Sequence, residues 1–579
     1  MSSPVDTTFV SGTTITSDWL NGVNDHVINI ESSAGSSFVG YSTGSGTVKT
    51  ALDIRLPEIA TYALLRAYTG SYTSQYVQGL SNIFDGAGGI FRVDVSDITS
   101  VDNNGTILVD ATGRRWKRDI SGNVNAAWFG FSPSASGAAN NTALQAAIDY
   151  AKTVTTTILT NKYVITTADV EINPGHFQVA DAVEVYSGVR VIGSGQSNTL
   201  LEHTGGATHF FVFTAAASEY LYNTWILDLA IKGAGKTTSD TLSAVKADRA
   251  TDGLAIYGCG VARCLITNCY EGINLQNCWT FEITDNEIYD VGRNFVRGLN
   301  VTAAKFKGNR MDTAGEDGLF ITFSATGAME TVALLLSQNV IQGCKRRGIY
   351  GYDADHVMWD HNYVENCNQD GGYAHVEFAS VSGTNAEMYS FVGGWVSPSS
   401  NTGQPAFRIA KARMVSANGV YIRSANFTYG FELGIDVEAY SIHCDANTTN
   451  GLVNVSGDVT GIAVGRFSAT LHGVDSETQS ASQTGSNVNS SLTVRTQEIN
   501  CTSGNRTYTL LDAHLQRGRR FTVQKVDGGA NQLIIAPSGT TKINGVNASI
   551  NSTAAYTRAE ILCGFEAGTS TPCWFVKFI

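Results

Sequence analysis

The sequence has 579 residues, of which only 15% are charged and 60 are glycine. This composition, also rich in Ser, Thr and Asn, is typical of short strands joined by turns and argues against a helical protein. The formal net charge of −13 and the absence of a long Lys/Arg cluster argue against a nucleic-acid partner. The first residues show no secretory signal, and no apolar run is long enough for membrane insertion.

The N-terminal region predicts a head and a small β-unit. Residues 1–30 contain two β-like runs and a turn of helix, and residues 32–47 form a Gly/Ser-rich connector. Residues 57–68 (PEIATYALLRAY) predict a helix, because a proline starts the segment and apolar residues follow at helical spacing. Residues 91–120 alternate between apolar and polar as strands do.

The clearest predicted helix covers residues 140–152 (NNTALQAAIDYAK), with Asn140 or Asn141 as its N-cap. No further helix is predicted from about residue 183 to residue 473. We expect the helix at 140–152 to cover the N-terminal end of the sheet that follows, because an exposed sheet edge must be protected.

A short phrase recurs between residues 268 and 378: a polar corner, a charged residue, a glycine and a strand. The glycines of this phrase are 46, 30 and 23 residues apart, and they are Gly272, Gly318, Gly348 and Gly371. The first gap equals two steps of 23, with residues 294–300 (NFVRGLN) as the intermediate unit. A repeat of this length made of strands predicts the stacked coils of a β-solenoid.

The C-terminal region predicts a separate β-domain. Residues 476–491 are polar and predict a linker, and residues 492–579 contain short strands separated by turns, a pattern typical of a β-sandwich. Three of the ten cysteines, Cys269, Cys344 and Cys367, recur at the same corner of the repeat. We expect them to be buried without disulfides, and the lack of CxxC or HxxxH spacing predicts neither a metal nor a cofactor.

Both ends of the chain resemble bacteriophage tail spikes and tail fibres. Residues 1–30 (with TTFVSGTTITSDWLNGVND) resemble their docking peptide, and residues 64–130 (LLRAYTG to NAAWFG) resemble the neck of phage capsular polysaccharide depolymerases. Residues 521–545 (FTVQKVDGGANQLIIAPSGTTKING) resemble the terminal β-domain of phage tail fibres. The resemblance implies an all-β homotrimer around a pectate-lyase-like, right-handed parallel β-helix.

The resemblance also implies a domain order and partners. It places a docking peptide at 1–30, a head/neck domain at 31–124, a catalytic β-helix at 125–475, a linker at 476–491, and a β-sandwich at 492–579 for trimerisation or carbohydrate binding. The implied location is the virion tail, which acts at the host cell surface. The implied partners are a bacterial capsular polysaccharide, two further copies of the chain, and another tail protein that binds residues 1–30. No catalytic residue follows, because this family shares no catalytic motif in the helix.

Alignment of the repeat on its glycines predicts which side chains face solvent. The inward positions hold Ile273, Leu275, Leu319, Ile321, Ile349, Ala374 and Val376. The outward positions hold Asn274, Gln276, Phe320, Thr322, Tyr350, Tyr352, Tyr373, His375 and Glu377. Tyrosines stack on sugar faces and donate hydrogen bonds, so Tyr350, Tyr352, Tyr373 and His375 are predicted to bind substrate. The alternative is an aromatic ladder that only stabilises the sheet.

Three carboxylates are predicted to be catalytic: Glu316, Asp317 and Glu377. Coils of a β-solenoid lie about 4.8 Å apart, so carboxylates on nearby coils fall roughly 5 to 10 Å apart, the range of glycosidase pairs. Glu316 beside Asp317 could raise the pKa of one of them, as a general acid requires. The alternative is that Asp-Gly simply forms the turn.

The roles of Arg346, Arg347 and Tyr352 leave further alternatives open. Arg346 and Arg347 could bind uronate carboxylates of the substrate or bridge Asp317 and Asp370 on neighbouring coils. Tyr352 with His375 or Arg347 would also suit a lyase, in which a base removes the proton beside a uronate carboxylate.

The expected function is therefore depolymerisation of a capsule by glycosidic hydrolysis. A polysaccharide lyase and a non-catalytic receptor-binding spike are the alternatives. Interfaces of a trimer would bury outward apolar residues such as Phe320, Phe391 and Trp395.

Overall fold

The computed structural model describes most of residues 57–579 and leaves out the N-terminal 56 residues. The internal gaps are 121, 160–162, 167, 206–207, 216–218, 238–241, 249–254, 324–330, 381–387, 425, 438–439, 449–452, 456–466, 470–477, 481–487, 490–495, 500–505, 511–519, 526–529, 538–541, 555 and 566–571. The predicted docking peptide and connector lie outside the described residues. The chain divides into two compact units, one before residue 123 with residues 127–130 added, and one containing the rest.

The N-terminal unit is a five-stranded sheet in the order β1-β2-β3-β5-β4. Its elements are β1 (Glu58–Thr61), α3 (Tyr62–Arg66), β2 (Ser74–Gly79), β3 (Gly89–Asp94), β4 (Ile107–Val109), β5 (Arg115–Arg118) and the short η2 (Ala126–Phe129). The helix predicted over 57–68 is wrong in its first half, because β1 pairs parallel with β2 there. Thr61 then caps α3, since its Oγ1 accepts from the backbone N–H of Leu64 at 3.4 Å.

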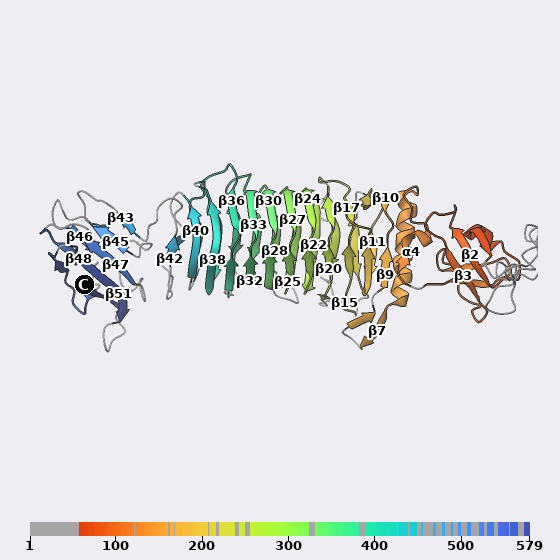
Figure 1. The fold of residues 1–579 in the computed structure, drawn as a ribbon, viewed down its shortest axis with the longest axis horizontal. Helices are drawn as coiled ribbons and strands as arrows, with labels where there is room; N and C mark the ends of the chain where they lie inside the picture. Colours follow the sequence, from red (N-terminus) through yellow and green to blue (C-terminus); the bar gives the residue numbers. More distant parts are fainter. Residues whose placement is uncertain are drawn as a thin grey trace, which may run out of the picture. The chain divides into compact units, whose positions relative to one another are not determined.

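The second unit contains three columns of parallel strands, in which each strand pairs with the equivalent strand of the next coil (Figure 1). The first column consists of β6 (Val124–Asn125), β9 (Ala168–Glu171), β12 (Val189–Ile192), β16 (Trp225–Leu227), β20 (Gly260–Ala262), β23 (Glu282–Thr284), β26 (Lys305–Lys307), β29 (Val332–Ser337), β32 (Asp355–Asp360), β35 (Met388–Val392), β38 (Met414–Arg423), β40 (Tyr440–Asn447) and β42 (Phe467–Ala469). The second column consists of β10 (Gly175–Val179), β13 (Thr199–His203), β17 (Ala230–Lys232), β21 (Leu265–Thr267), β24 (Glu287–Val291), β27 (Arg310–Ala314), β30 (Val340–Cys344), β33 (Tyr363–Cys367), β36 (Trp395–Pro398) and the C-terminal parts of β38 and β40.

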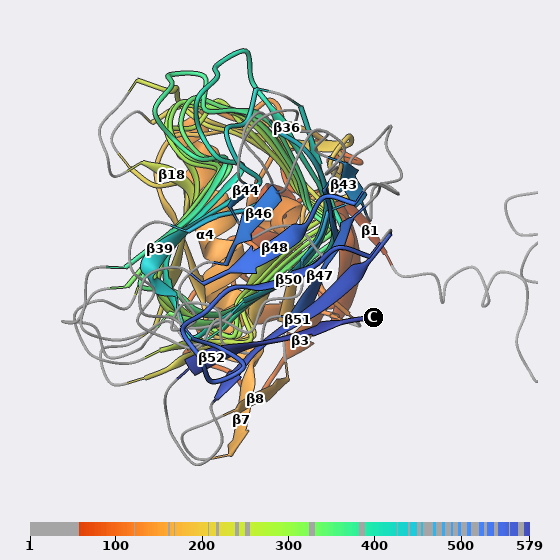
Figure 2. The same cartoon turned by 90° about the vertical axis from the view of Figure 1, so that its left-hand side faces the viewer.

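The third column carries the repeated phrase. It consists of β11 (Val183–Tyr186), β14 (Phe211–Thr214), β18 (Ser243–Asp248), β22 (Glu271–Trp279), β25 (Val296–Thr302), β28 (Leu319–Thr322), β31 (Ile349–Tyr352), β34 (Val376–Ala379), β37 (Phe407–Ala412), β39 (Phe431–Val437) and β41 (Val453–Val455). The short β15 (Leu221–Tyr222) and β19 (Ile256–Tyr257) pair beside β22, and β7 (Thr156–Leu159) pairs with β8 (Tyr163–Thr166). Figure 2 looks along the stack and shows its coils superimposed. The predicted solenoid is therefore confirmed.

The register of the third column confirms the unit predicted at residues 294–300, because β25 pairs with both β22 and β28. Glycine recurs where successive coils approach closely. A Cβ on Gly318 would lie 2.3 Å from the backbone oxygen of Gly348, and one on Gly272 would lie 2.4 Å from that of Phe295. Only glycine fits such a gap. Gly371 does not belong to this series, because it lies in a turn with φ +77°.

The interior of the stack is apolar, as the repeat predicts. All seven residues predicted to point inward are at most 2% exposed. The nine cysteines in the described part of the chain are buried, and none of them forms a disulfide. Phe391, which we expected to point outward, is 1% exposed, because its place in β35 is in register with the buried Trp359 of β32.

A ladder of buried asparagines, not predicted from the sequence, also runs along the stack. In this ladder Asn286, Asn309 and Asn339 each donate from Nδ2 to Oδ1 of the next asparagine, at 3.0, 2.8 and 2.8 Å, and Asn362 is the last member. Each Nδ2 also donates to a backbone oxygen of the preceding coil. The polar groups buried at this corner are thus satisfied from coil to coil.

The predicted capping helix is present as α4 (Gly137–Val154), which packs against β9, β10 and β11 at the first coil of the stack (Figure 1). Its N-cap is Ser136 rather than Asn140 or Asn141. Asn140 is fully buried and donates to the backbone oxygen of Gln178 in β10, so it ties the helix to the stack instead of capping it.

The C-terminal residues form two sheets around one apolar core, as the predicted β-sandwich requires. One sheet contains β43 (Thr478–Ser480), β45 (Thr496–Ile499), β47 (Arg520–Lys525), β51 (Arg558–Phe565), β52 (Pro572–Phe578) and β49 (Lys542–Ile543), and the other contains β44 (Val488–Asn489), β46 (Arg506–Thr509), β48 (Leu533–Ala536) and β50 (Ile550–Ser552). The segment 476–491, expected as a linker, supplies β43 and β44, because sheet pairing uses backbone hydrogen bonds that polar residues can also make. Within the described residues, none of the helices has the length and hydrophobicity of a membrane span.

Candidate functional site

The predicted site residues gather on the outer side of the third column. Phe320, Tyr350, Glu377 and Arg408 are in register on β28, β31, β34 and β37. The corner residues of the same coils lie next to them. We call this surface the arginine–carboxylate face; its charged members are Glu271, Arg293, Arg297, Glu316, Asp317, Arg346, Arg347, Glu377, Arg408 and Glu432.

A buried column of polar residues lies at the corner of this face. Glu271 and Asp317 are both fully buried, and Asn294 lies between them on the intervening coil. Asn294 donates from Nδ2 to Glu271 Oε1 at 3.4 Å, and its Oδ1 accepts from the backbone N–H of Asp317 at 3.1 Å. The backbone N–H of Arg347 then donates to Asp317 Oδ1 at 3.0 Å. Each coil is therefore fixed to the next by a side chain of this column.

Arg347 links two of the predicted catalytic carboxylates. It donates from Nε to Glu377 Oε2 at 2.8 Å and from a terminal nitrogen to Asp317 Oδ1 at 3.2 Å. Both bonds come from one planar guanidinium, so the two carboxylates lie within about 8 Å of each other. The rings of Tyr350 and Tyr373 pack on the guanidinium, with their centres 4.1 and 4.6 Å from its carbon. These contacts hold Arg347 in one orientation.

The third predicted carboxylate, Glu316, is also paired within the protein. Its Oε2 lies 3.1 Å from Arg293 Nε and 3.2 Å from a terminal nitrogen of Arg346. Its side chain is 26% exposed, against 13% for Glu377. The bridging alternative for Arg346 and Arg347 is therefore present in the structure, although Arg347 bridges Asp317 to Glu377 and not to Asp370.

Burial dominates the electrostatics of this face. It raises the pKa of Asp317 and of Glu271, and the neighbouring arginines partly offset the shift. It also raises the pKa of Tyr350, which disfavours this phenol as a base. Because Asp317 is inaccessible in this conformation, it positions Arg347, and of the three predicted carboxylates only Glu316 and Glu377 are partly exposed.

The prediction that His375 points outward is wrong. The side chain is 1% exposed, and its ring packs edge-on against Phe427 with the ring centres 4.9 Å apart. His375 takes the corner position that Gly348 holds one coil earlier, because its backbone oxygen accepts from the Gly348 N–H at 2.8 Å. Burial lowers its pKa to about 3. His375 therefore cannot contact a polysaccharide here or serve as a base for a lyase.

The predicted tyrosines are partly exposed and form a ladder with Phe320. The ring centres of Phe320 and Tyr350 are 5.3 Å apart, and those of Tyr350 and Tyr352 are 6.5 Å apart. This spacing suits both alternatives from the sequence, a sugar platform and a ladder that stabilises the sheet. The arginines Arg293 and Arg408 were missed, although Arg293 lies 23 residues before Glu316, one step of the repeat.

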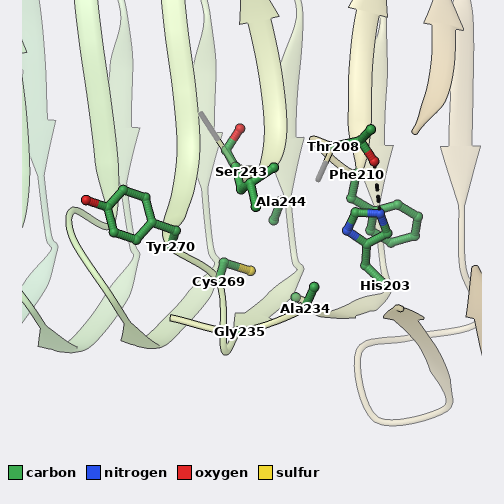
Figure 3. Close-up of a pocket in the computed structure, with 11 residues that line it drawn as sticks. His203, Thr208, Phe210, Ala234, Gly235, Ser243, Ala244, Cys269 and Tyr270 are labelled. Carbon is green, nitrogen blue, oxygen red and sulfur yellow. Dashed lines mark hydrogen bonds between the residues drawn. The ribbon is translucent and has the colours of Figure 1, made fainter. Parts of the chain in front are cut away.

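A small cavity lies elsewhere in the stack, between the second and third columns (Figure 3). Its volume is about 10 Å³, enough for one water molecule at most. Thr208 Oγ1 lies 3.4 Å from His203 Nε2 at its wall, and Cys269 and Phe210 also line it. Burial lowers the pKa of His203. No group of three His, Cys, Asp or Glu side chains in the described part of the chain is placed to hold a metal ion.

Two segments of the chain match known families. Residues 58–121 match the phage tail protein small four-stranded β-sheet domain, and residues 234–386 match the right-handed β-helix region. The chain joins a phage tail domain to a right-handed β-helix. The resemblance to phage tail proteins and the handedness expected for the solenoid are thereby confirmed.

Solved structures that match the chain include two phage tailspikes and a glucanase. The gp42 tailspike of Acinetobacter phage vb_AbaP_AS12 matches with a TM-score of 0.48 at 12% identity, over 91% of this chain and 92% of that one. The enzymatically active domain of bacteriophage CBA120 tailspike protein 2 matches with 0.44 at 13%, over 97% and 82%. A GH87 α-1,3-glucanase from Streptomyces thermodiastaticus matches with 0.42 at 14%, over 80% and 70%. Similarity this distant carries no argument about activity.

Proposed function

We propose that this chain is a tail spike of a bacteriophage that binds and depolymerises a bacterial capsular polysaccharide at the host surface. The observation that carries the proposal is the covalent joining of a phage tail domain to a long parallel β-helix. The outer surface of this helix presents columns of aromatic and charged side chains in register. Such columns extend over many coils, so they can contact successive sugars of a long chain.

Hydrolysis is favoured over β-elimination. A lyase needs a base near the proton beside a uronate carboxylate. Of the side chains predicted for that role, His375 is buried with a pKa of about 3 and Arg347 is paired with Asp317 and Glu377, so neither is available to take the proton. Partly exposed carboxylates, in contrast, recur on the stack, among them Glu316 and Glu377, and glycosidases use two carboxyl groups. The assignment of Glu316, Asp317 and Glu377 to catalysis stays a prediction.

We also propose that the chain forms a homotrimer. Exposed apolar side chains on the first column support the proposal: Met388 and Met414 are in register on β35 and β38, and they are 37% and 44% exposed. Val392 of β35 and Met358 of the neighbouring strand β32 are each 43% exposed. A contact between copies would remove this apolar surface from water.

The test is to incubate the purified chain with a panel of purified capsular polysaccharides. Shortened chains with new reducing ends, and without the ultraviolet absorbance of unsaturated uronates, would support hydrolysis. New absorbance of that kind would indicate a lyase. Binding to a polysaccharide that is never shortened would indicate a receptor-binding spike without activity.

A further inference from the structure

A groove lies on the outer side of the second column, across β27, β30, β33 and β36, which lie side by side in Figure 1. It encloses about 480 Å³. Asp312, Gln342 and Glu365 line it in register on three successive coils, and Pro398 and Ser400 line its far end. A volume of this size accommodates a short stretch of sugars.

The two carboxylates of the groove are about as far apart as the catalytic carboxylates of inverting glycosidases. Asp312 and Glu365 lie two coils apart, which corresponds to about 9.5 Å between their backbones. Asp312 Oδ2 accepts from Gln342 Nε2 at 2.6 Å, so its carboxylate leans toward the coil between them. Carboxylates of inverting glycosidases are about 6.5–9.5 Å apart, which leaves room for a water molecule.

Unlike the carboxylates of the arginine–carboxylate face, these two are available. Neither Asp312 nor Glu365 forms an ion pair with any residue that the structure describes. Both are partly exposed. Among the described residues, the hydrogen-bond donors to these carboxylates are neutral: Gln342 and the Thr313 hydroxyl for Asp312, and Tyr363 for Glu365. A carboxylate without a cationic partner can exchange a proton with a substrate.

The backbone beside Asp312 follows the turn of the repeat and leaves room for the carboxylate. Thr313, next to Asp312, has φ +67°, and the equivalent residues of the neighbouring coils, Asp290, Gly343 and Asn366, also have positive φ. This left-handed turn therefore belongs to every coil of this region. A Cβ added to Gly343 would lie 2.9 Å from Asp312 Oδ1, so a side chain there would meet the carboxylate.

An aromatic ladder runs beside the groove, two residues away along each strand and on the same side of the column. The ring centres of Tyr363 and Trp395 are 5.8 Å apart, and those of Trp395 and Tyr421 are 5.0 Å apart. These side chains are partly exposed. Burial and the neighbouring Glu365 raise the pKa of Tyr363 to about 12, so its phenol remains a hydrogen-bond donor. Aromatic faces of this kind stack on the apolar faces of sugars.

We propose that this groove binds a segment of polysaccharide against Tyr363 and Trp395 and that Asp312 and Glu365 hydrolyse it with inversion. The proposal rests on the depolymerase function above and assigns the cut to these residues. Glu365, beside the aromatic ladder, donates its proton to the glycosidic oxygen as the bond from that oxygen to the anomeric carbon breaks. Asp312 takes a proton from the water that attacks the anomeric carbon from the opposite face. The products are a free alcohol and a new reducing end; Asp312 then releases its proton to solvent, and solvent returns a proton to Glu365.

The negative charge of the groove also limits which kind of sugar can lie at the cleaved bond. Asp312 and Glu365 would repel a uronate carboxylate placed between them, because the residues that line the groove include no Lys or Arg. The nearby cation Arg423 lies over the ring of Trp395, with its guanidinium carbon 5.4 Å from the ring centre. The groove therefore fits a sugar without a carboxylate at the cleaved position. This chemistry differs from the uronate recognition considered for Arg346 and Arg347.

The experiment compares Asp312→Asn, Glu365→Gln and Trp395→Ala with the wild type on each polysaccharide of the panel. We expect the two carboxylate variants to lose at least about 100-fold in kcat with unchanged melting temperatures. We expect Trp395→Ala to raise KM. Glu282→Gln, in a partly exposed carboxylate of the first column, is the matched control and should cut at the wild-type rate. Nuclear magnetic resonance of fresh product should show the inverted anomer.

Three results would overturn the assignment. They are full activity of both carboxylate variants, a retained anomer, and loss of cleavage only on substitution of Glu316 or Glu377. If the wild type shortens no polysaccharide, the depolymerase proposal fails instead. In that case affinity electrophoresis in gels containing each polysaccharide still tests the groove as a binding site, because wild type should be retarded and Trp395→Ala should not.

Discussion

Arg347 donates from Nε to Glu377 Oε2 at 2.8 Å, across the gap between two coils. The same guanidinium reaches back to Asp317 on the preceding coil, so one side chain joins three turns of the helix. Asp317 is fully buried, whereas Arg347 keeps 15% of its side chain exposed. The ion pair between Arg347 and Asp317 is therefore mostly buried, and loss of Arg347 should lower the stability of the β-helix.

We therefore expect Arg347→Ala to lower the stability of the β-helix by about 3 kcal/mol or more, because the substitution leaves Asp317 charged and buried without its cation. The measurement is the guanidinium chloride midpoint of the β-helix transition. Arg346→Ala is the matched control: its side chain is 38% exposed and pairs with the partly exposed Glu316. The stability lost in Arg346→Ala should stay below about 1 kcal/mol. Equal losses for the two variants would contradict this account of Arg347.

His375 should give the β-helix a measurable dependence on pH. Its pKa is about 3 in the folded chain, against about 6.5 for an unperturbed histidine. Below pH 6.5 the unfolded state takes up a proton that the folded state refuses. The contribution of His375 is therefore complete above pH 6.5 and is lost, by up to about 1.4 kcal/mol per pH unit, as pH falls toward 3.

His375→Leu tests this directly. The two ring nitrogens have no hydrogen-bond partner among the residues that the structure describes, so Leu should cost little at pH 7 or stabilise the helix. The difference in stability between variant and wild type should grow as pH is lowered from 6.5, when unfolding is measured at a series of pH values. A difference that does not change with pH would mean that His375 is hydrated or charged in the folded chain.

Asn339→Ala should destabilise the helix because Asn339 is an internal member of the asparagine ladder. It donates to the Phe306 backbone oxygen at 2.7 Å and to Asn362 Oδ1 at 2.8 Å, and it accepts from Asn309. The buried groups left without partners should cost about 1–3 kcal/mol. Lys305→Ala, which breaks only an exposed pair with Glu282, serves as the comparison in the same denaturation experiment and should change stability much less.

Substitution of Met388 and Met414 by Lys should weaken self-association. The two side chains are adjacent and exposed on the first column, and six added charges in a trimer would make burial of this surface unfavourable. Light scattering with size-exclusion chromatography measures the mass of wild type and double variant. A wild-type trimer whose double variant has the same mass at all concentrations would place the interface on another surface.

The repeat allowed the stacked strands and their inward residues to be predicted, because alternation of period two and a step of 23 residues both follow from the geometry of a coil. The same reasoning failed at the coil that ends in β34. There Gly371 lies in a turn, and His375 takes the corner place of a glycine, so an alignment on glycines assigns the histidine to the wrong side.

The pairing of charges could not be predicted in the same way. Which arginine reaches which carboxylate depends on side-chain conformation across coils, and Arg347 passes Asp370 to reach Glu377. The column of Asp312, Gln342 and Glu365 could have been predicted from the spacing of these residues in the sequence. These residues are 30 and 23 residues apart, the same gaps as Gly318, Gly348 and Gly371. The repeat was aligned on glycines that lie next to the third column, so the alignment did not include these positions of the second column.

The buried cysteines bear on how the chain withstands oxidants. Burial raises the pKa of Cys259, Cys264 and Cys269 to about 12, so their thiols stay protonated at neutral pH. Oxidants and alkylating agents react with the thiolate, and only when it is accessible. The folded chain would therefore keep these sulfurs intact without disulfides, and reaction of these thiols with an alkylating agent would report opening of the coils.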